Sequence, residues 1–369
     1  NRNYTISGDI IISTQDVSVY KDQYSRFRNE TWNIETPEGA EIVKVLLYFH
    51  YNWDTSFFPN GWNLSFNGNE ITNDYITFEK DRGNLGYYGA YDYGLLVFDV
   101  TDYYEVNTNN SFVITKTGNC ALYPSTLVVL YNMTGSDITK DVYFSDVCDV
   151  YYPYYNSNGY DDMLKTVVYF NDIDLRDLNT ATWYAFGASG GNNDASLSFN
   201  NKTYENAYKQ QGSNDCYPIV IDVSDLISQN NEAWFITSTK SSTVVAYEQI
   251  LVITRPFENE LILPDNLTAG EDANITFTVP RDAEGEVTIS VGGVDYPAEI
   301  IDGKATVTVD GLAAGNHTIV AVYSGDDYYK PVTVIGKLEV TKEDPEIVIS
   351  DIEGNVGDTV EANVTIAGG

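Results

Sequence analysis

A run of acidic and amide side chains at residues 171–177 offers the oxygen ligands that a hard cation prefers. The run reads Asn-Asp-Ile-Asp-Leu-Arg-Asp, and Asn-Asn-Asp follows at residues 192–194. Calcium takes about six to eight oxygens from carboxylates and carbonyls on a turn. Arg176 offers the alternative that a guanidinium pairs with these acids, and no EF-hand pattern occurs. Calcium is therefore the one cofactor that the sequence suggests. Its candidate ligands are Asp172, Asp174, Asp177 and Asp194.

Aromatic side chains concentrate at residues 52–62, Asn-Trp-Asp-Thr-Ser-Phe-Phe-Pro-Asn-Gly-Trp, and at residues 151–155, Tyr-Tyr-Pro-Tyr-Tyr. Tyrosine alone accounts for 30 residues. Flat rings stack on sugar faces, and a tyrosine adds one hydrogen bond at a low entropy cost. The alternative is that Trp53 and Trp62 fill the core between two sheets. The candidate ligand-binding residues are Trp53, Phe57, Phe58, Trp62, Tyr152 and Tyr154.

Residues for nucleophilic or acid–base catalysis are scarce. His50 and His317 are the two histidines, and no GxSxG, P-loop or HExxH motif occurs. His50 ends an apolar run beside aromatic residues, where a packed or surface histidine is more frequent than a general base. A glycoside hydrolase needs two positioned carboxylates, and the sequence nominates no such pair among 54 acids. We therefore expect no enzymatic activity.

The charge balance excludes one large class of partner. The chain has 20 basic and 54 acidic residues, a net charge of -34. Nucleic-acid binding needs clustered Lys and Arg, so we expect no nucleic-acid partner. No apolar run approaches about 18 residues, so no transmembrane segment is expected. The chain starts at Asn1 without a methionine, which we interpret as a secreted protein after loss of its signal peptide.

Asn-x-Ser/Thr sequons favour an extracellular, cell-surface location, where such sites must face solvent to be glycosylated. The candidate glycosylation sites are Asn3, Asn29, Asn63, Asn109, Asn132, Asn201, Asn266, Asn274, Asn316 and Asn363.

Three cysteines, Cys120, Cys148 and Cys216, stand outside any CxxC or zinc-type spacing. An odd number cannot close a disulfide framework. A Cys148–Cys216 disulfide, a Cys120–Cys148 disulfide and three buried thiols all remain open.

Two repeats organise the chain. Residues 357–366 resemble residues 270–279, as in an array of modules. Within the first 255 residues, four segments recur in the same order, which indicates a duplication with an insertion near residues 171–195. The paired segments are 44–49 with 165–170, 64–68 with 197–201, 96–102 with 219–225, and 126–130 with 249–253.

Short alternating runs between turn clusters predict an all-β protein. One helical turn is expected at residues 99–104 and another at 222–227, each after a strand. We predict a duplicated antiparallel β-sandwich head, jelly-roll-like, followed by an immunoglobulin-like sandwich and the start of a second. The expected divisions are 1–150 and 151–256 for the halves of the head, 257–342 for an Ig-like repeat, and 343–369 for a truncated second repeat.

The segments 303–307, 311–323 and 324–329 carry the pieces Leu-x-x-Gly-x-His-Thr and Tyr-x-Gly-Asp-x-x-Tyr. They resemble the bacterial-type Ig-like repeat of adhesin-like proteins. The layout of a duplicated β head before such repeats resembles the adhesin-like cell-surface proteins of methanogenic archaea. The resemblance implies a structural role for His317 and a turn at Asp326-Asp327. It carries over no binding residue.

The resemblance and the aromatic loops together favour a secreted adhesin-like surface protein. Its head would bind a glycan or protein on a partner cell, displayed on a stalk of Ig-like repeats. The alternative is a structural surface or filament component that contacts copies of itself. A glycan-active enzyme comes third.

Overall fold

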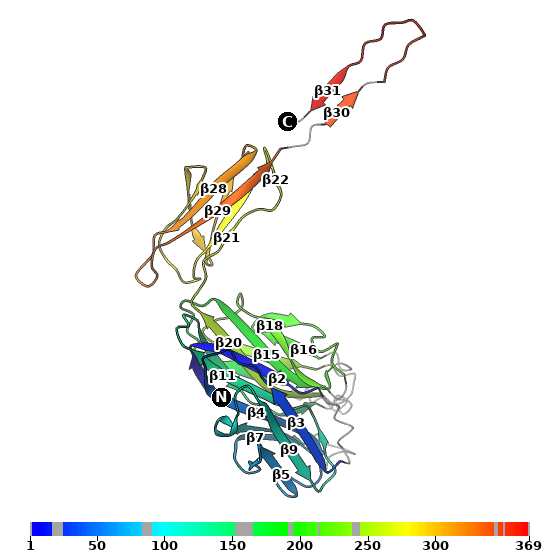
Figure 1. The fold of residues 1–369 in the computed structure, drawn as a ribbon, viewed down its shortest axis with the longest axis vertical. Coiled ribbons are helices and arrows are strands. Elements are labelled where there is room, and N and C mark those ends of the chain that lie inside the picture. Colours follow the sequence, from blue (N-terminus) through cyan, green and yellow to red (C-terminus); the bar gives the residue numbers. More distant parts are fainter. Residues whose placement is uncertain are drawn as a thin grey trace. The chain divides into compact units, whose positions relative to one another are not determined.

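The structure is a computed structural model that describes residues 2–16, 25–82, 91–151, 165–190, 195–212, 215–237, 244–342, 346–349 and 351–367. The chain divides into two compact units, Asn1–Pro256, here called the head, and Phe257–Gly369, the C-terminal unit (Figure 1). The regular structure of the described ranges consists of β-strands and the 3₁₀ helix η2 (Thr101–Tyr103). The prediction of an all-β protein is therefore confirmed.

The first part of the head forms two sheets. The first inner sheet has the order β2-β11-β4-β8-β7, with β10 also paired to β4, and the first outer sheet has the order β3-β9-β5-β6. The inner strands are β2 (Gly8–Thr14), β4 (Ala40–Asp54), β7 (Tyr75–Arg82), β8 (Asp92–Asp99), β10 (Ala121–Leu122) and β11 (Thr126–Met133). The outer strands are β3 (Phe27–Asn33), β5 (Trp62–Phe66), β6 (Asn69–Glu70) and β9 (Asn109–Lys116).

The second inner sheet has the order β1-β12-β20-β15-β18, with β13 paired to β20, and the second outer sheet has the order β14-β19-β16-β17. The inner strands are β1 (Arg2–Ile6), β12 (Thr139–Ser145), β13 (Asp149–Tyr151), β15 (Thr180–Ala188), β18 (Cys216–Asp222) and β20 (Val244–Arg255). The outer strands are β14 (Lys165–Phe170), β16 (Ser196–Phe199), β17 (Lys202–Tyr204) and β19 (Asn231–Ile236). Strands β1, β12 and β13 thus pair across the division at residue 150 that the sequence suggests.

Three apolar cores separate these four sheets. The two inner sheets share the central core, to which Tyr48 and Val128 contribute from one sheet and Phe186 and Ile250 from the other. Each inner sheet also packs against its own outer sheet. Both faces of an inner sheet are therefore covered, and β20 is buried at ten consecutive positions, whereas β3 alternates between exposed and buried side chains.

All three cysteines are free thiols in these cores. Cys148 and Cys216 lie in the central core, and Cys120 lies between the first inner and first outer sheets. Of the open alternatives, three buried thiols is the one that the structure shows. Burial raises the pKa of each thiol well above its usual value, which makes all three poor nucleophiles.

A pair of asparagines recurs in the two parts of the head. The amide of Asn67 donates to Oδ1 of Asn110 at 2.8 Å, and the amide of Asn200 donates to Oδ1 of Asn231 at 3.0 Å. The first member of each pair has a left-handed backbone, with φ of 46° and 50°. Asn tolerates this conformation better than most residues. Asn110 and Asn231 are buried, so the same polar cluster anchors both outer sheets to their turns.

A second recurring contact corrects the sequence alignment of the halves. The hydroxyl of Thr101 accepts a hydrogen bond from Val45 N, and that of Ser224 accepts one from Ala181 N. Strand β4 therefore corresponds to β15, so the sequence comparison was wrong to match it with residues 165–170. Apolar β-branched and aromatic residues suit any buried strand, so composition alone produced that match. The insertion near residues 171–195 was inferred from that mismatch, so the corrected alignment no longer supports it.

The expected helical turns occur at those hydroxyls. Helix η2 covers Thr101–Tyr103. In the second half, the N–H groups of Leu226 and Ile227 both donate to Val223 O, which forms a single hydrogen-bonded turn.

The C-terminal unit begins with a sandwich of two sheets, ordered β21-β23-β27-β26 and β22-β29-β28-β24-β25. The first sheet contains β21 (Leu261–Ile262), β23 (Ala273–Thr278), β26 (Ile300–Ile301) and β27 (Lys304–Val309). The second contains β22 (Leu267–Thr268), β24 (Val287–Val291), β25 (Val294–Ala298), β28 (Gly315–Tyr323) and β29 (Val332–Thr341). Its core includes Ile275, Phe277, Ile289 and Tyr323. This arrangement is the immunoglobulin-like sandwich that the alternating runs predict.

Asp326 explains the Tyr-x-Gly-Asp-x-x-Tyr signature. Its Oδ1 accepts from Tyr328 N at 2.7 Å and Tyr329 N at 2.8 Å, and its Oδ2 accepts from the Tyr323 hydroxyl at 2.7 Å and Glu284 N at 2.8 Å. Desolvation alone would raise the pKa of Asp326, but these hydrogen bonds outweigh it and lower the pKa to about 2. The carboxylate therefore ties three segments together as an anion.

Asp326→Asn should destabilise the Ig-like sandwich by about 2 kcal/mol, because charge-assisted hydrogen bonds to a closed turn are lost. The folded pKa lies below the unfolded value of about 3.9, so the stabilisation is present above about pH 4 and is lost as the pH falls towards 2. Hydrogen exchange of residues 257–342 across this pH range measures both effects. The exposed neighbour gives the control, since Asp327→Asn should change little. Equal effects of the two substitutions would contradict the assignment.

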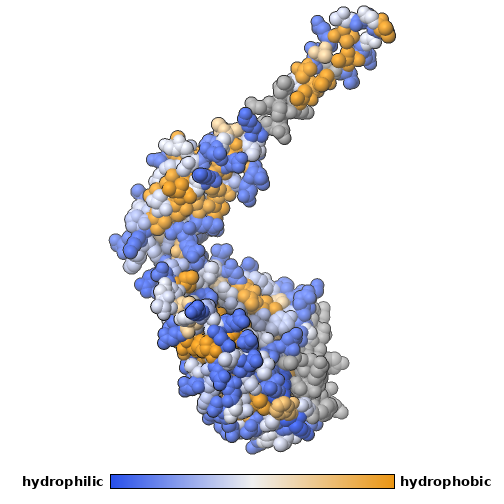
Figure 2. Space-filling model, in the orientation of Figure 1, coloured by the Kyte–Doolittle hydropathy of each residue, from blue (hydrophilic) through white to orange (hydrophobic). Residues whose placement is uncertain are grey.

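Beyond this sandwich, β30 (Glu346–Ile349) and β31 (Val364–Ala367) form a two-stranded hairpin. Apolar side chains are visible along it in Figure 2. Ile347, Val348 and Ile349 are 59%, 51% and 61% exposed. Consecutive strand residues point to opposite faces, so both faces of the hairpin are apolar and uncovered in this structure.

Candidate functional site

The aromatic loop between β4 and β5 is held by one buried carboxylate. Oδ1 of Asp54 accepts from the N–H of Ser56 at 2.9 Å and from its hydroxyl at 2.6 Å, and Oδ2 accepts from Phe58 N at 2.8 Å. Asp54 is fully buried. The peptide bond between Phe58 and Pro59 is cis, and Trp53 and Phe57 have φ values of 55° and 59°. The loop is thus held by Asp54, the last residue of β4.

The structure divides the predicted aromatic ligand-binding residues. Phe58 and Trp62 are buried, each 7% exposed, and their rings pack against each other at 5.8 Å in the core of the first sandwich. Their ring faces are therefore used in packing and cannot stack on a ligand. For Trp62 this is the alternative given above, in which the side chain fills the core between two sheets. Trp53 is partly buried and donates from Nε1 to the Tyr93 hydroxyl at 2.7 Å. Phe57 is 44% exposed.

The remaining two aromatic candidates, Tyr152 and Tyr154, lie outside the described residues, so their roles stay predictions.

A groove of about 560 Å³ lies beside this loop, at the ends of β5 and β9. Cross-strand pairing sets its shape, because Trp62 is opposite Lys116 and Asn63 is opposite Thr115. Two cations and several amide or hydroxyl groups line it, and none of its lining residues within the described ranges is acidic. The lining residues are Arg26, Gly61, Trp62, Asn63, Thr115, Lys116 and Thr117.

The two cations of the groove differ in their freedom. Lys116 is 4% exposed, and its Nζ donates to Ser25 O at 2.6 Å. Arg26 is exposed, and its guanidinium forms no ion pair with any residue in the part of the chain that the structure describes. Sequence reasoning missed both residues, because 90 positions separate them and neither belongs to a basic cluster.

A second, smaller groove of about 340 Å³ lies between β1 and the end of β14, with Arg2 and Asp172 among its lining residues. The guanidinium of Arg2 already contacts Asp146 at 2.7 Å and the hydroxyl of Tyr48 at 3.0 Å. The cation is therefore neutralised within the protein, which makes this groove the weaker candidate.

Trp234 is a further aromatic residue that the sequence reasoning did not select. It lies on the outward face of β19, between the buried residues Ala233 and Phe235. Its Nε1 donates to Glu232 at 3.3 Å, and Lys165 Nζ lies 5.3 Å from its ring. Strand alternation over residues 231–236 is the signal that could have found this solvent-facing ring.

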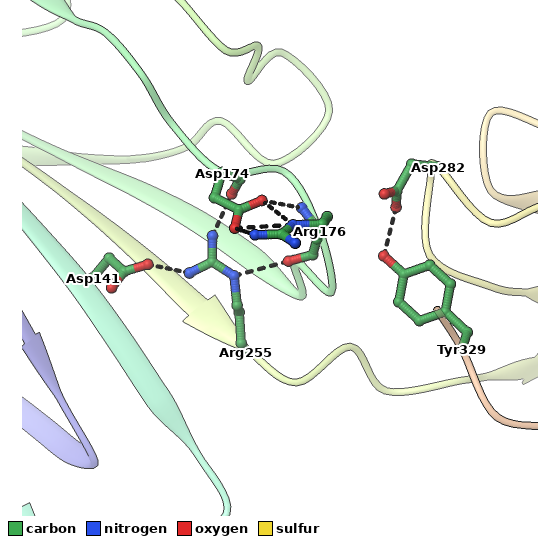
Figure 3. A network of polar contacts seen from close by, with 6 residues as sticks. All are labelled: Asp141, Asp174, Arg176, Arg255, Asp282 and Tyr329. Atoms are coloured by element: carbon green, nitrogen blue, oxygen red, sulfur yellow. Dashed lines mark hydrogen bonds and ion pairs between the residues drawn. The ribbon is translucent and has the colours of Figure 1, made fainter. Parts of the chain in front are cut away.

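Of the candidate calcium ligands, Asp174 is the one whose contacts with arginines the structure shows. Asp174 contacts Arg176 at 2.5 Å, and Arg255 contacts Asp141 and the carbonyl of Asp174 (Figure 3). Hydrogen bonds from Arg176 lower the pKa of Asp174 to about 2. Asp172 and Asp177 lie at left-handed turn positions, with φ of 58° and 54°. Figure 3 also shows the hydrogen bond from Tyr329 to Asp282 in the C-terminal unit.

Among the described residues, no group of three or more His, Cys, Asp or Glu side chains is arranged to hold a metal ion. The candidate Asp194 lies outside them, so calcium binding stays a prediction. The ion pair between Asp174 and Arg176, the alternative to calcium binding, accounts for the contacts of the Asp174 carboxylate.

All ten candidate glycosylation sites lie in described segments. Nine of these asparagines are exposed, and Asn132 is half-buried. Asn29, Asn63 and Asn109 all lie on the first outer sheet. Solvent exposure is what attachment of a glycan requires, and occupancy stays a prediction.

Comparison with known families divides the chain at the same place as the structure. Residues 1–254 match a family described as "Protein of unknown function (DUF3344)", and residues 262–341 match the bacterial Ig-like domain, group 3. No curated protein matches the chain. No helix in the described ranges is long and apolar enough to cross a membrane.

Solved structures give only distant similarities. A β-glucuronidase from Ruminococcus gnavus is 12% identical, with a TM-score of 0.16 over 50% of this chain and 36% of that one. PorU from Porphyromonas gingivalis is 13% identical, with a TM-score of 0.22 over 84% and 34%. The adhesin domain of Epf from Streptococcus pyogenes is 7% identical, with a TM-score of 0.17 over 55% and 72%. The chain thus covers about a third of the first two proteins, and similarities this low carry no functional argument.

Proposed function

The chain belongs to the DUF3344 family through its head and carries a bacterial Ig-like domain, and we propose that it is an extracellular adhesin-like surface protein whose head binds a partner surface. The observation that carries the proposal is the cationic groove beside the aromatic loop. Asp54 holds the loop, and the pairing of β5 with β9 holds the lining residues Trp62, Asn63, Thr115 and Lys116. A preformed site of this kind binds without the cost of ordering its own backbone.

The groove favours binding over catalysis. Where the structure describes it, the lining supplies cations, hydroxyls and an amide, and no pair of carboxylates that could serve as acid and nucleophile. The resemblance to adhesin-like proteins of methanogenic archaea supports the same function. Ig-like units act as spacers, and weak sites displayed in many copies bind a surface strongly.

A structural surface or filament component that contacts copies of itself is the second candidate. In that case the protein would self-associate, and its partners would be copies of itself.

The two functions are separated by testing the purified chain against intact microbial cells and a glycan array, with sedimentation velocity on the same sample. We expect saturable binding by a monomer. Self-association without saturable binding would replace the adhesive function with the structural one. Polysaccharide turnover would contradict both.

A further inference from the structure

We propose that the groove at Arg26 and Lys116 binds a sugar that carries one carboxylate, within a glycan of low charge density. The inference rests on the proposed binding function of the head and adds the ligand class. Its basis is the contrast between the groove and the rest of the chain. Acidic residues outnumber basic residues 54 to 20 in the chain, yet the described residues that line the groove include two cations and no acid.

The contrast between the groove and the rest of the chain indicates how much negative charge the ligand carries and how that charge is spaced. At short range, the two cations attract an anion in the groove. At longer range, the net charge of -34 repels a densely charged polymer, and this repulsion extends over roughly 8 Å at physiological salt. A ligand with isolated carboxylates is attracted locally by the groove and is only weakly repelled by the net charge of the chain. Nucleic acids and heavily sulfated chains are repelled strongly.

Arg26 is suited to a carboxylate by its shape as well as its charge. A guanidinium presents parallel N–H groups that match the two carboxylate oxygens. Because Arg26 is exposed and forms no ion pair with a described residue, this fork is available to a ligand. Lys116 lies in the same lining, where it is buried and its Nζ donates to Ser25 O.

The floor of the groove supplies partners for sugar hydroxyls. Thr117 N donates to Gly61 O at 2.8 Å, which brings the two residues together. A Cβ on Gly61 would lie 2.1 Å from the Thr117 hydroxyl, so glycine is needed here both for this approach and for its φ of 77°. The exposed side chains of Asn63 and Thr117 are thus left beside the cations. The volume of about 560 Å³ is within the range of small-ligand sites.

The test measures binding of the full chain to a hyaluronan hexasaccharide, in which carboxylate-bearing and neutral sugars alternate. The matched control ligand is the same hexasaccharide with its carboxyl groups reduced to alcohols. Methyl β-glucuronide and methyl β-glucoside form a minimal pair with the same difference. Calorimetry gives Kd, and NMR reports the Arg26 side-chain signals.

We expect the acidic member of each pair to bind more tightly by about tenfold or more, with the difference falling at high salt. Arg26→Gln should weaken acidic-ligand binding by about 10-fold to 100-fold, and Arg26→Lys by less, because it keeps the charge but not the fork. Lys116→Met should weaken it by several-fold. Lys202→Gln is the control cation on the second outer sheet and should leave Kd unchanged.

Equal binding of acidic and reduced ligands overturns the inference, as does an Arg26→Gln variant that binds like the original protein. Absence of any Arg26 signal change with both acidic probes at millimolar concentration also overturns it. Binding of the full chain to intact cells that persists in Arg26→Gln would reject this ligand class while leaving the adhesive function in place. If the original protein binds no cells at all, both this ligand class and the adhesive function are rejected.

Discussion

Replacing His50 by leucine should lower the stability of the head by about 3–5 kcal/mol. Nε2 of His50 lies 2.9 Å from Oε2 of Glu248, Nδ1 lies 3.2 Å from the carbonyl of Pro124, and both side chains of the pair are fully buried. Both ring contacts are to oxygens, so a proton lies between imidazole and carboxylate. Without His50, the carboxylate of Glu248 stays buried and loses its partner, which is the costly way to break such a pair.

The double substitution His50→Leu with Glu248→Met should recover most of that loss, because it removes both polar groups and retains comparable volume. All five tryptophans of the chain lie in the head, so urea unfolding followed by tryptophan fluorescence reports on this unit. Recovery identifies the unpartnered carboxylate as the cause. A double variant no more stable than His50→Leu would instead point to packing in the central core.

Asn110→Ala and Asn231→Ala should each destabilise the head by about 3 kcal/mol. Oδ1 of Asn110 accepts from Glu105 N, and its amide donates to Glu105 O, both at 2.8 Å. Asn231 repeats both contacts with Ser228, at 2.8 and 2.7 Å. Alanine leaves several buried or half-buried backbone groups unpaired. Each unpaired group destabilises the head by about 1–3 kcal/mol, less where water can hydrogen-bond to it.

Tryptophan fluorescence again measures the effect, and Asn109→Ala is the matched control. Asn109 precedes Asn110 on β9, and its exposed side chain should tolerate the change to within about 0.5 kcal/mol. Similar losses at Asn110 and Asn231 would show that the duplicated clusters have equivalent roles. A loss at one site alone would contradict that equivalence.

The sequence predicted best the features that depend on local patterns. The turn at Asp326 came from the resemblance to the Ig-like repeat, whereas the alternation over Ala273–Thr278 was recoverable because the residues of one strand face lie within a few positions of each other. The recurring segment after Asp99 was recognisable for the same reason. The fold class and the Ig-like unit followed from such signals.

Features that depend on distant partners were not recoverable. The burial of β4 on both faces requires a second inner sheet, and no signal within the strand says which sheet covers it. Trp62 resembled a loop residue open to ligand, but packing against Phe49 and Tyr51 placed it in the core. Arg26 reaches the groove because its carbonyl accepts from Lys116 N, just before β3 begins its pairing with β9, and nothing in the sequence associates these two residues.

Strand β20 is the last element of the head before Pro256, and it lies between β12 and β15, hydrogen-bonded to both. Tension applied from the C-terminal side and resisted by a ligand held in the head therefore enters an interior strand. The hydrogen bonds to β12 and to β15 then share the load. An edge strand has only one neighbour, so its cross-strand hydrogen bonds would break one after another. The same placement that buries β20 thus gives the head a mechanical anchorage suited to withstanding shear.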